Sequence, residues 1–300
     1  MKKILYSLLS IGAVALVAVA ATGAFFSDTE TSVDNTFIAG ELDLQIDSEC
    51  QYYQNDLPVG CFQTFPSPTP PIAFGNWSLG NLTTEKFFDF LDVKPGDYGE
   101  NTISLHVFDN DAWVCMDIEN MENDDNTCTE PEDGVDELGI PNPTPGACGT
   151  DPNGGELAQN LNFFAWLDEG ATDGFQGQGQ DPTEGDNEWQ DGPEPPLFSN
   201  VIGPASDVLN GVTYTLADSN FSVIGGPFIG STTYYIGVTW CAGTLSVDVP
   251  DVDNDNMTGQ PFLDCDGEAM VNDTQSDSLV ADLTFRAEQW RNNPTFTCED

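Results

Sequence analysis

The chain has 300 residues, of which 51 are acidic and 6 are basic, so its formal net charge at pH 7 is −45. This balance argues against nucleic acid as a partner, because binding a phosphate backbone requires clustered cationic side chains. The charge also opposes compaction and self-association at low ionic strength. Assembly of this chain therefore needs either salt that screens the carboxylates or divalent cations bound between them, and the composition leaves these two alternatives open.

Residues 1–24 have the organisation of a secretory signal peptide. Lys2 and Lys3 precede an apolar run over residues 4–21, and the small residues Thr22 and Ala24 precede the expected cleavage site. The alternative is one membrane-spanning helix, because about 18 to 20 apolar residues can cross a bilayer. Polar residues within the run and acidic residues after it favour cleavage. We therefore expect a secreted, extracellular or cell-surface protein that meets a membrane only if the leader is retained.

The mature part begins with an apolar tail and a strand. Phe25 and Phe26 follow the leader, and Leu42, Leu44 and Ile46 then alternate with polar residues. Alternation with a period of two predicts a half-buried strand. A chain that begins with exposed phenylalanines and a strand has a segment that it can insert into a partner.

Most of the remaining chain reads as short strands joined by Pro- and Gly-rich loops. We predict strands over residues 101–108, 212–216, 231–240 and 279–288, which are rich in β-branched and aromatic residues. Pro95 and Gly96 suit the central positions of a type II turn, after a strand that ends near Val93. Residues 156–167 fit a helix, whereas residues 162–168 fit a strand equally well. The fold class expected is all-β, a single β-sandwich over residues 25–300.

Three acidic insertions interrupt this pattern, at about residues 120–151, 168–194 and 248–266. Neither of the first two can bury much apolar surface, so we expect both to be exposed loops. Asp251, Asp253 and Asp255 recur at every second position, as in the opening of an EF-hand calcium loop. No glycine follows at the sixth position, and Phe262 stands where a bidentate glutamate is required, so the loop is not an EF-hand. It remains a candidate for a looser calcium site.

A second candidate calcium site combines Asp168 with Asp186 and Glu188, because calcium binds several carboxylate oxygens. A plain solvated loop is the alternative in both places. No cofactor is required by any motif, and calcium is the one ion that the composition suggests.

The eight cysteines all lie after the leader, which fits an oxidising exterior. They are Cys50, Cys61, Cys115, Cys128, Cys148, Cys241, Cys265 and Cys298. The even number predicts disulfides, whose connectivity the sequence leaves open. Pairs that close short loops, Cys50 with Cys61 and Cys115 with Cys128, are preferred. Five sequons are candidate surface glycosylation sites, at Asn76, Asn81, Asn220, Asn256 and Asn272.

Three segments carry a resemblance to a known family. They are A-F-F-S-D-T-E-T-S with N-T-F-I-A-G-E-L-D-L near the N-terminus, D-V-K-P-G-D over residues 92–97, and F-R-A-E-Q-W over residues 285–290. Together they resemble the TasA/camelysin family of secreted proteins, which depend on a SipW-type signal peptidase. The resemblance implies a jelly-roll-like sandwich. It also implies extracellular filaments, in a biofilm matrix or a bundling pilus, built by donation of an N-terminal strand to a neighbouring copy.

On this resemblance the donor strand is residues 25–37, with Phe25, Phe26, Val33 and Phe37 as apolar anchors. The acceptor would include residues 279–290. The partners implied are a second copy, joined head to tail, and the signal peptidase during export. The alternative for the tail is that it completes the edge of its own sheet.

Two other functions were weighed. A calcium-stabilised adhesion or binding module at the cell surface is the main alternative. Camelysin-type relatives have been classed as metallopeptidases, but a zinc peptidase needs two histidines one helical turn apart, and His106 is the only histidine. His106 lies in a strand pattern, which also disfavours a hydrolase triad. We therefore expect a protein that is not an enzyme.

Overall fold

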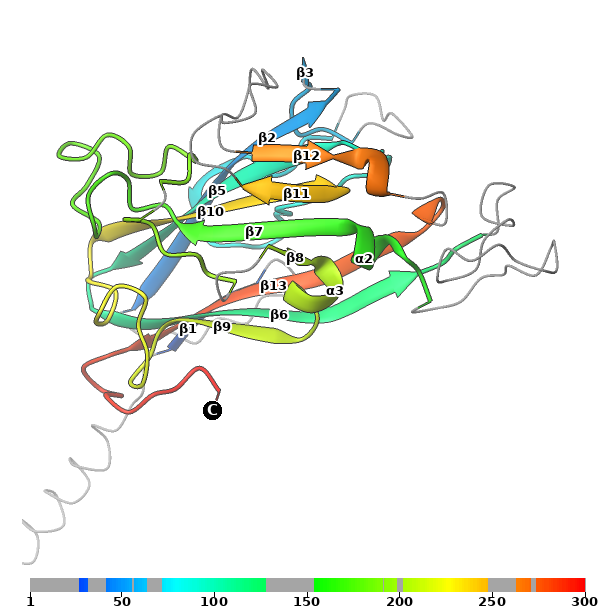
Figure 1. Cartoon of the computed structure of the whole chain (residues 1–300). Helices are drawn as coiled ribbons and strands as arrows, with labels where there is room; N and C mark the ends of the chain where they lie inside the picture. The colour runs from blue at the N-terminus through cyan, green and yellow to red at the C-terminus, as the bar shows by residue number, and fades with distance from the viewer. Residues whose placement is uncertain are drawn as a thin grey trace, which may run out of the picture.

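The computed structural model describes residues 27–31, 42–55, 57–63, 72–127, 154–190, 192–198, 202–247, 263–270 and 274–299, which are arranged mainly in antiparallel strands (Figure 1). In chain order the elements are β1 (Ser27–Thr31), β2 (Asp43–Gln54), β3 (Leu57–Pro58), β4 (Trp77–Gly80), β5 (Tyr98–Phe108), β6 (Ala112–Asp124), α2 (Leu157–Asn160), β7 (Leu161–Leu167), β8 (Gly203–Pro204), α3 (Ala205–Val208), β9 (Val212–Ala217), β10 (Thr232–Ala242), β11 (Thr244–Val247), β12 (Leu263–Asp266), η2 (Gly267–Ala269) and β13 (Ser278–Gln289).

Two sheets face each other as the layers of a sandwich (Figure 1). The smaller sheet has the strand order β1-β13-β6-β9, and the larger has the order β3-β2-β5-β10-β7-β8, with β4 pairing β2. Strands β11 and β12 form a separate hairpin. From β5 onward, successive long strands lie alternately in the larger and the smaller sheet, which is a jelly-roll-like connectivity. The first two long strands, β2 and β5, pair with each other in the larger sheet. The predicted all-β sandwich is confirmed.

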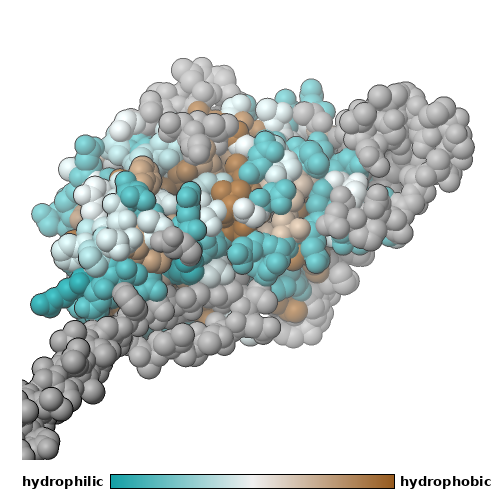
Figure 2. All heavy atoms as spheres, turned by 90° about the horizontal axis from the view of Figure 1, so that it is seen from below, coloured by the Kyte–Doolittle hydropathy of each residue, from teal (hydrophilic) through white to brown (hydrophobic). Residues whose placement is uncertain are grey.

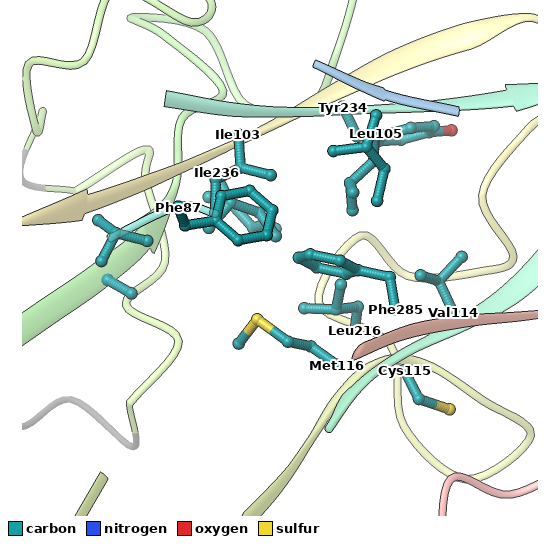
Figure 3. Close-up of a cluster of buried hydrophobic side chains, with 14 of the residues drawn as sticks. Phe87, Ile103, Leu105, Val114, Cys115, Met116, Leu216, Tyr234, Ile236 and Phe285 are labelled. Carbon is teal, nitrogen blue, oxygen red and sulfur yellow. The ribbon is translucent and has the colours of Figure 1, made fainter. Parts of the chain in front are cut away.

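The core fills the space between the two sheets (Figure 3). Phe285, Met116 and Leu216 point up from the smaller sheet toward Ile103 and Ile236 of the larger one. Phe87 lies between the layers, with its ring centroid 6.2 Å from that of Phe285. Burying one such side chain stabilises the fold by roughly 1.5 to 3 kcal/mol. The alternation of Leu42, Leu44 and Ile46 is explained by this core, because all three are buried in it.

A second apolar cluster lies on the opposite face of the larger sheet. It consists of Tyr53, Tyr98, Phe164, Trp166, Cys241, Leu245 and Leu263. The Trp166 indole lies directly over Gly237, where any Cβ atom would collide with it. The hairpin β11–β12 covers this cluster and is fastened to β10 by the disulfide Cys241–Cys265. At this end, therefore, the larger sheet is buried on both faces.

The predicted strands are confirmed as β5, β9, β10 and β13, each one to three residues longer than expected at one or both ends. The region that fitted both helix and strand contains both, as α2 followed by β7. The turn at Pro95–Gly96 is also confirmed, since the Asp97 N–H donates to the Lys94 carbonyl over 2.9 Å and Gly96 has a φ of 83°. No strand ends near Val93, so that part of the prediction is wrong. In the part of the chain that the structure describes, no helix is long and apolar enough to cross a membrane.

Three disulfides join the six cysteines that the structure describes. Cys50 is bonded to Cys61, as preferred from the sequence. The preferred pairing of Cys115 with Cys128 is wrong, because Cys115 is bonded to Cys298. Cys115 lies on β6, whose outer face is covered by the C-terminal segment. This segment places Cys298 beside Cys115, although the two cysteines are 183 residues apart in the sequence. Cys128 and Cys148 lie outside the described residues.

Replacing both Cys115 and Cys298 with alanine should destabilise the protein more than replacing Cys50 and Cys61. The first bridge closes a loop with a sequence separation of 183 and the second one of 11. Chain entropy alone predicts costs of about 5 and about 3 kcal/mol, respectively. Guanidinium unfolding of the two double variants measures the difference, and equal midpoints would contradict the entropic account.

Candidate functional site

The N-terminal strand β1 lies at the edge of the smaller sheet and pairs antiparallel with β13 (Figure 1). The register places Ser27 opposite Glu288 and Thr31 opposite Thr284. For these five residues, therefore, the structure shows the alternative to donation: the tail completes the edge of its own sheet. Phe25, Phe26, Val33 and Phe37, the expected anchors of the donor strand, lie outside the described residues. The strand expected to accept the tail, residues 279–290, contains the strand that β1 pairs with.

Apart from the edge that pairs with β1, strand β13 is fixed by the core, by β6 and by the C-terminal segment. Phe285 and Ala287 are fully buried in the core, and β6 pairs with β13 along its length. On the outer face, the Arg286 Nε donates to Asp117 Oδ2 over 2.5 Å, and Arg286 Nη2 donates to the Cys298 carbonyl over 2.8 Å. The hydrogen bond that Arg286 donates to Asp117 raises the pKa of Arg286 above its ordinary value. The edge that receives β1 is thus a preformed surface, fixed by packing and by an ion pair.

Seen from below (Figure 2), the coloured surface is mainly hydrophilic or of intermediate hydropathy, and apolar residues gather in patches near its centre. Trp290 at the end of β13 is 40% exposed and Val280 is 56% exposed. Single apolar side chains of this kind are ordinary for a protein surface. The contact that joins β1 to β13 is the backbone ladder.

The second site candidate is the acidic loop, residues 168–194, which joins β7 to the segment before β8. The prediction that this loop is exposed is wrong for five of its carboxyl groups and right for others. Asp173, Asp186 and Glu188 are exposed, whereas Asp168, Glu169, Asp181, Glu184 and Glu194 are each at most 5% exposed. Their oxygens accept hydrogen bonds from backbone N–H groups. Glu184 accepts from Gly177, for example, at 2.9 Å. Such donors offset much of the cost of removing a carboxylate from water, and the loop folds around its acids.

Asp168 and Glu194, at opposite ends of the loop, are both buried, and each accepts hydrogen bonds from two backbone N–H groups. Asp168 accepts the N–H groups of Gly185 and Asn187 at 2.9 and 2.8 Å. Glu194 accepts those of Gly170 and Gln190 at 2.8 and 2.6 Å. Burial raises the pKa of both carboxyl groups, and the Asp186 carboxylate raises it further. Both groups therefore ionise less readily in the folded protein than in water.

The calcium ligands chosen from the sequence are not gathered into one set. Asp186 and Glu188 are both exposed, and the Asp186 Oδ1 accepts the N–H of Glu188. No group of three or more His, Cys, Asp or Glu side chains is arranged to hold a metal ion in the described ranges. Asp251, Asp253 and Asp255 lie outside the described residues. Glu194 is the residue that sequence reasoning missed, and the only available signal was its position at the end of the predicted loop.

His106 lies on β5, as its strand pattern predicts, between β2 and β10. Its Nε2 is 2.9 Å from Asp47 Oδ2, and its Nδ1 is 3.0 Å from Thr233 Oγ1. Burial alone would raise the pKa of Asp47, but hydrogen bonds from His106 and Ser104 outweigh burial and lower it. The histidine thus links three neighbouring strands on the sheet face.

The sequons differ in their surroundings. Asn76 and Asn220 are exposed, whereas Asn81 is half-buried and its Oδ1 is shielded from solvent. The Asn76 Oδ1 accepts the N–H of Cys50 at 3.0 Å. Asn256 and Asn272 lie outside the described residues. Of the three described sequons, Asn220 is the most open to modification.

Comparison of the chain with models of protein families, with curated proteins and with solved structures gave no match in any of the three searches.

In a chelator, the stability of the protein should fall as the pH is raised above about 4.5, because Asp168 and Glu194 ionise less readily in the folded than in the unfolded state. Their pKa values are raised by folding, so the folded state holds more protons than the unfolded state in this window. For each unit by which the pKa of a group in the folded state exceeds its pKa in the unfolded state, ionisation of the group lowers the free energy of unfolding by about 1.4 kcal/mol. The Glu194→Gln variant removes one titrating group and keeps an acceptor oxygen.

Urea unfolding between about pH 5 and 8 measures this effect as the difference between the original protein and Glu194→Gln. The original protein should lose more stability across the range than the variant. Identical slopes would show that the pair does not titrate in this way.

Proposed function

We propose that this chain is a secreted structural subunit that polymerises into extracellular filaments by exchanging its N-terminal strand with a second copy. The observation that carries the proposal is the pairing of β1 with the outer edge of β13. This pairing is a backbone ladder on a strand that is already fixed by the core and by Arg286. A strand that is added to a preformed edge in this way is the unit that strand exchange transfers.

The exchange needs no new kind of contact. A strand from a neighbour can make the same backbone hydrogen bonds to residues 284–288 as β1 makes within its own chain. Removal of β1 would leave the β13 edge without its partner, and an uncovered edge favours addition of another strand. Because each copy would donate at its N-terminus and accept at β13, the contact is head-to-tail and gives an open filament.

Secretion is supported by the chemistry of the cysteines and by the leader. The six cysteines in the described ranges are all bonded in pairs, which fits an oxidising compartment. The signal-peptide pattern of residues 1–24 and the resemblance to the TasA/camelysin family point the same way. A subunit with a net charge near −45 would polymerise only where salt or divalent cations reduce the repulsion between copies.

Deleting residues 25–33 should leave a soluble monomer that forms no filaments, because the deletion removes β1 and the segment before it. Electron microscopy and size-exclusion chromatography of the purified protein, in buffers in which the undeleted protein polymerises, check this outcome. Long fibres that persist after the deletion would rule out donation of this strand.

Engineered cysteines distinguish pairing within one chain from pairing between chains. Ser27 and Glu288 are opposite each other in the ladder, so Ser27→Cys and Glu288→Cys can form a disulfide wherever β1 meets β13. One preparation carries only Ser27→Cys and another only Glu288→Cys. After mixing and polymerisation, exchange predicts covalent dimers on a non-reducing gel, and the double variant should give a ladder of multimers.

The matched control combines Ser27→Cys with Thr284→Cys. Thr284 is opposite Thr31, about 13 Å along the strand from the position opposite Ser27, which is too far for a disulfide. This pair should not cross-link in either arrangement. If the double variant Ser27→Cys/Glu288→Cys runs only as an intramolecularly bonded monomer and the mixture gives no dimer, the tail stays in its own sheet and the proposal is wrong.

A further inference from the structure

The end of the molecule around β3 is free of charge. Residues 57–84 contain no acidic, basic or histidine side chain, although 19% of the residues in the chain are charged. The other uncharged run of similar length after the leader, residues 219–247, includes the largely buried strand β10. In Figure 1, β3 lies at the top of the molecule and β1 near the bottom, so this end is distinct from the edge at which strand exchange is proposed.

Exposed apolar side chains gather at this end. They lie on residues 57–63 and 72–75, here called the neutral tip, and are Leu57, Val59, Phe62 and Ile72, with exposed fractions of 66%, 40%, 45% and 51%. The two segments are joined to each other: Phe62 forms a β-bridge with Ala73, and the Gln63 N–H donates to the Ile72 carbonyl over 2.9 Å. Single exposed apolar residues are ordinary, whereas several on one small element mark a contact surface.

The neutral tip is held in place before any partner arrives. The disulfide Cys50–Cys61 fastens it to β2. The Val59 N–H donates to the Tyr52 carbonyl over 2.9 Å, and the Phe74 N–H donates to the Cys61 carbonyl over 3.1 Å. Because the segment is already ordered, binding to it costs little conformational entropy.

The charge of the chain limits what can dock on the neutral tip. Copies with a formal charge of −45 repel each other, and the repulsion is weakest where the surfaces that meet are uncharged. An acid beside the tip, Asp89, accepts from the Gln63 side chain and pairs with Lys86 Nζ at 3.2 Å, so its charge is balanced. An anionic partner gains nothing at a neutral surface, and a cationic one would bind the acidic residues elsewhere. The tip therefore suits an uncharged apolar partner, and the tip of a second copy is one.

We propose that the neutral tip docks on the neutral tip of a second copy, in a two-fold contact that buries Leu57, Phe62 and Ile72 of both. The same patch meets itself, so the contact closes as a dimer. Few side chains are buried, so we expect a dissociation constant of about 10⁻⁴ to 10⁻³ M. If the filaments proposed above form, each copy brings a tip, and many weak contacts would hold two filaments side by side. That consequence rests on the proposed function, whereas the tip contact itself does not.

Cross-linking of the purified mature protein tests the contact. Leu57→Cys places a thiol at the most exposed of the four side chains, and Phe221→Cys places one in the second uncharged run, where Phe221 is 55% exposed. At about 0.1 mM protein and about 1 M sodium chloride, which shortens the Debye length to about 3 Å, a bismaleimide reagent should join Leu57→Cys copies into covalent dimers. Phe221→Cys should give about tenfold fewer dimers. A denaturing gel separates these dimers from copies that are held together only by strand exchange.

A matched pair of second substitutions in the Leu57→Cys protein shows whether the tip itself is responsible. Phe62→Asp puts like charges into the contact and should lower the yield of dimer at least about tenfold. Phe221→Asp makes the same change outside the contact and should alter the yield less than about twofold. The comparison of the two single cysteine variants stands even if an aspartate variant does not fold.

The inference is overturned if Leu57→Cys gives no more dimer than Phe221→Cys, or if the two aspartate variants give equal yields. A neutral lipid surface could occupy the tip instead. If phosphatidylcholine vesicles bind the mature protein but not Phe62→Asp, and no dimer forms, the second copy is the wrong partner. A Leu57→Cys dimer that forms in a protein without filaments would support the tip contact and count against the proposed function alone.

Discussion

The scarcity of positive side chains is the constraint that shapes this protein. With 51 acidic and 6 basic residues, ion pairs cannot neutralise most of the carboxylates. The structure accommodates its carboxylates in two ways. One of the few cations, Arg286, lies at a structural position, where it joins β13, Asp117 and the C-terminal segment. Elsewhere, backbone N–H groups take the role of cations and allow carboxylates such as Glu184 to be completely buried. A loop that looks like a solvated insertion can therefore be a folded unit.

Strands buried on one face and strands buried on both faces carry different sequence signals. β5 and β10 are almost wholly buried and are predicted from their β-branched and aromatic residues, not from alternation. β13 and the start of β2 alternate, because one face meets the core and the other is partly open. The first seven residues of β6 are all buried, because the C-terminal segment covers the face that points away from the core. β7 is nearly as buried, under Trp189 and the β11–β12 hairpin. Neither strand shows a period of two, so periodicity alone could not reveal them.

The sites could be predicted from the sequence only where they depend on neighbouring residues. The turn at Pro95–Gly96 could be predicted because it depends on the φ angles of two adjacent residues. The bond from Cys115 to Cys298 depends on which strands become neighbours, and the burial of Asp168 and Glu194 depends on how the loop folds. A preference for short loops is a reasonable prior for disulfides, and here it is right for Cys50 and wrong for Cys115. Likewise, the spacing of acids along a loop did not reveal which of them the folded loop would bury.

Strand β13 has a consequence for the order in which the protein can fold. Its neighbours in the smaller sheet are β1, near the start of the chain, and β6, and Cys298 beyond it is bonded to Cys115 on β6. The smaller sheet thus cannot close until the chain has emerged as far as residue 289, however early β2 and β5 pair. Contacts between such distant segments form slowly, because a long loop must be ordered before they are made. During that interval the N-terminal segment is without its partner and can meet other molecules before its own last strand arrives.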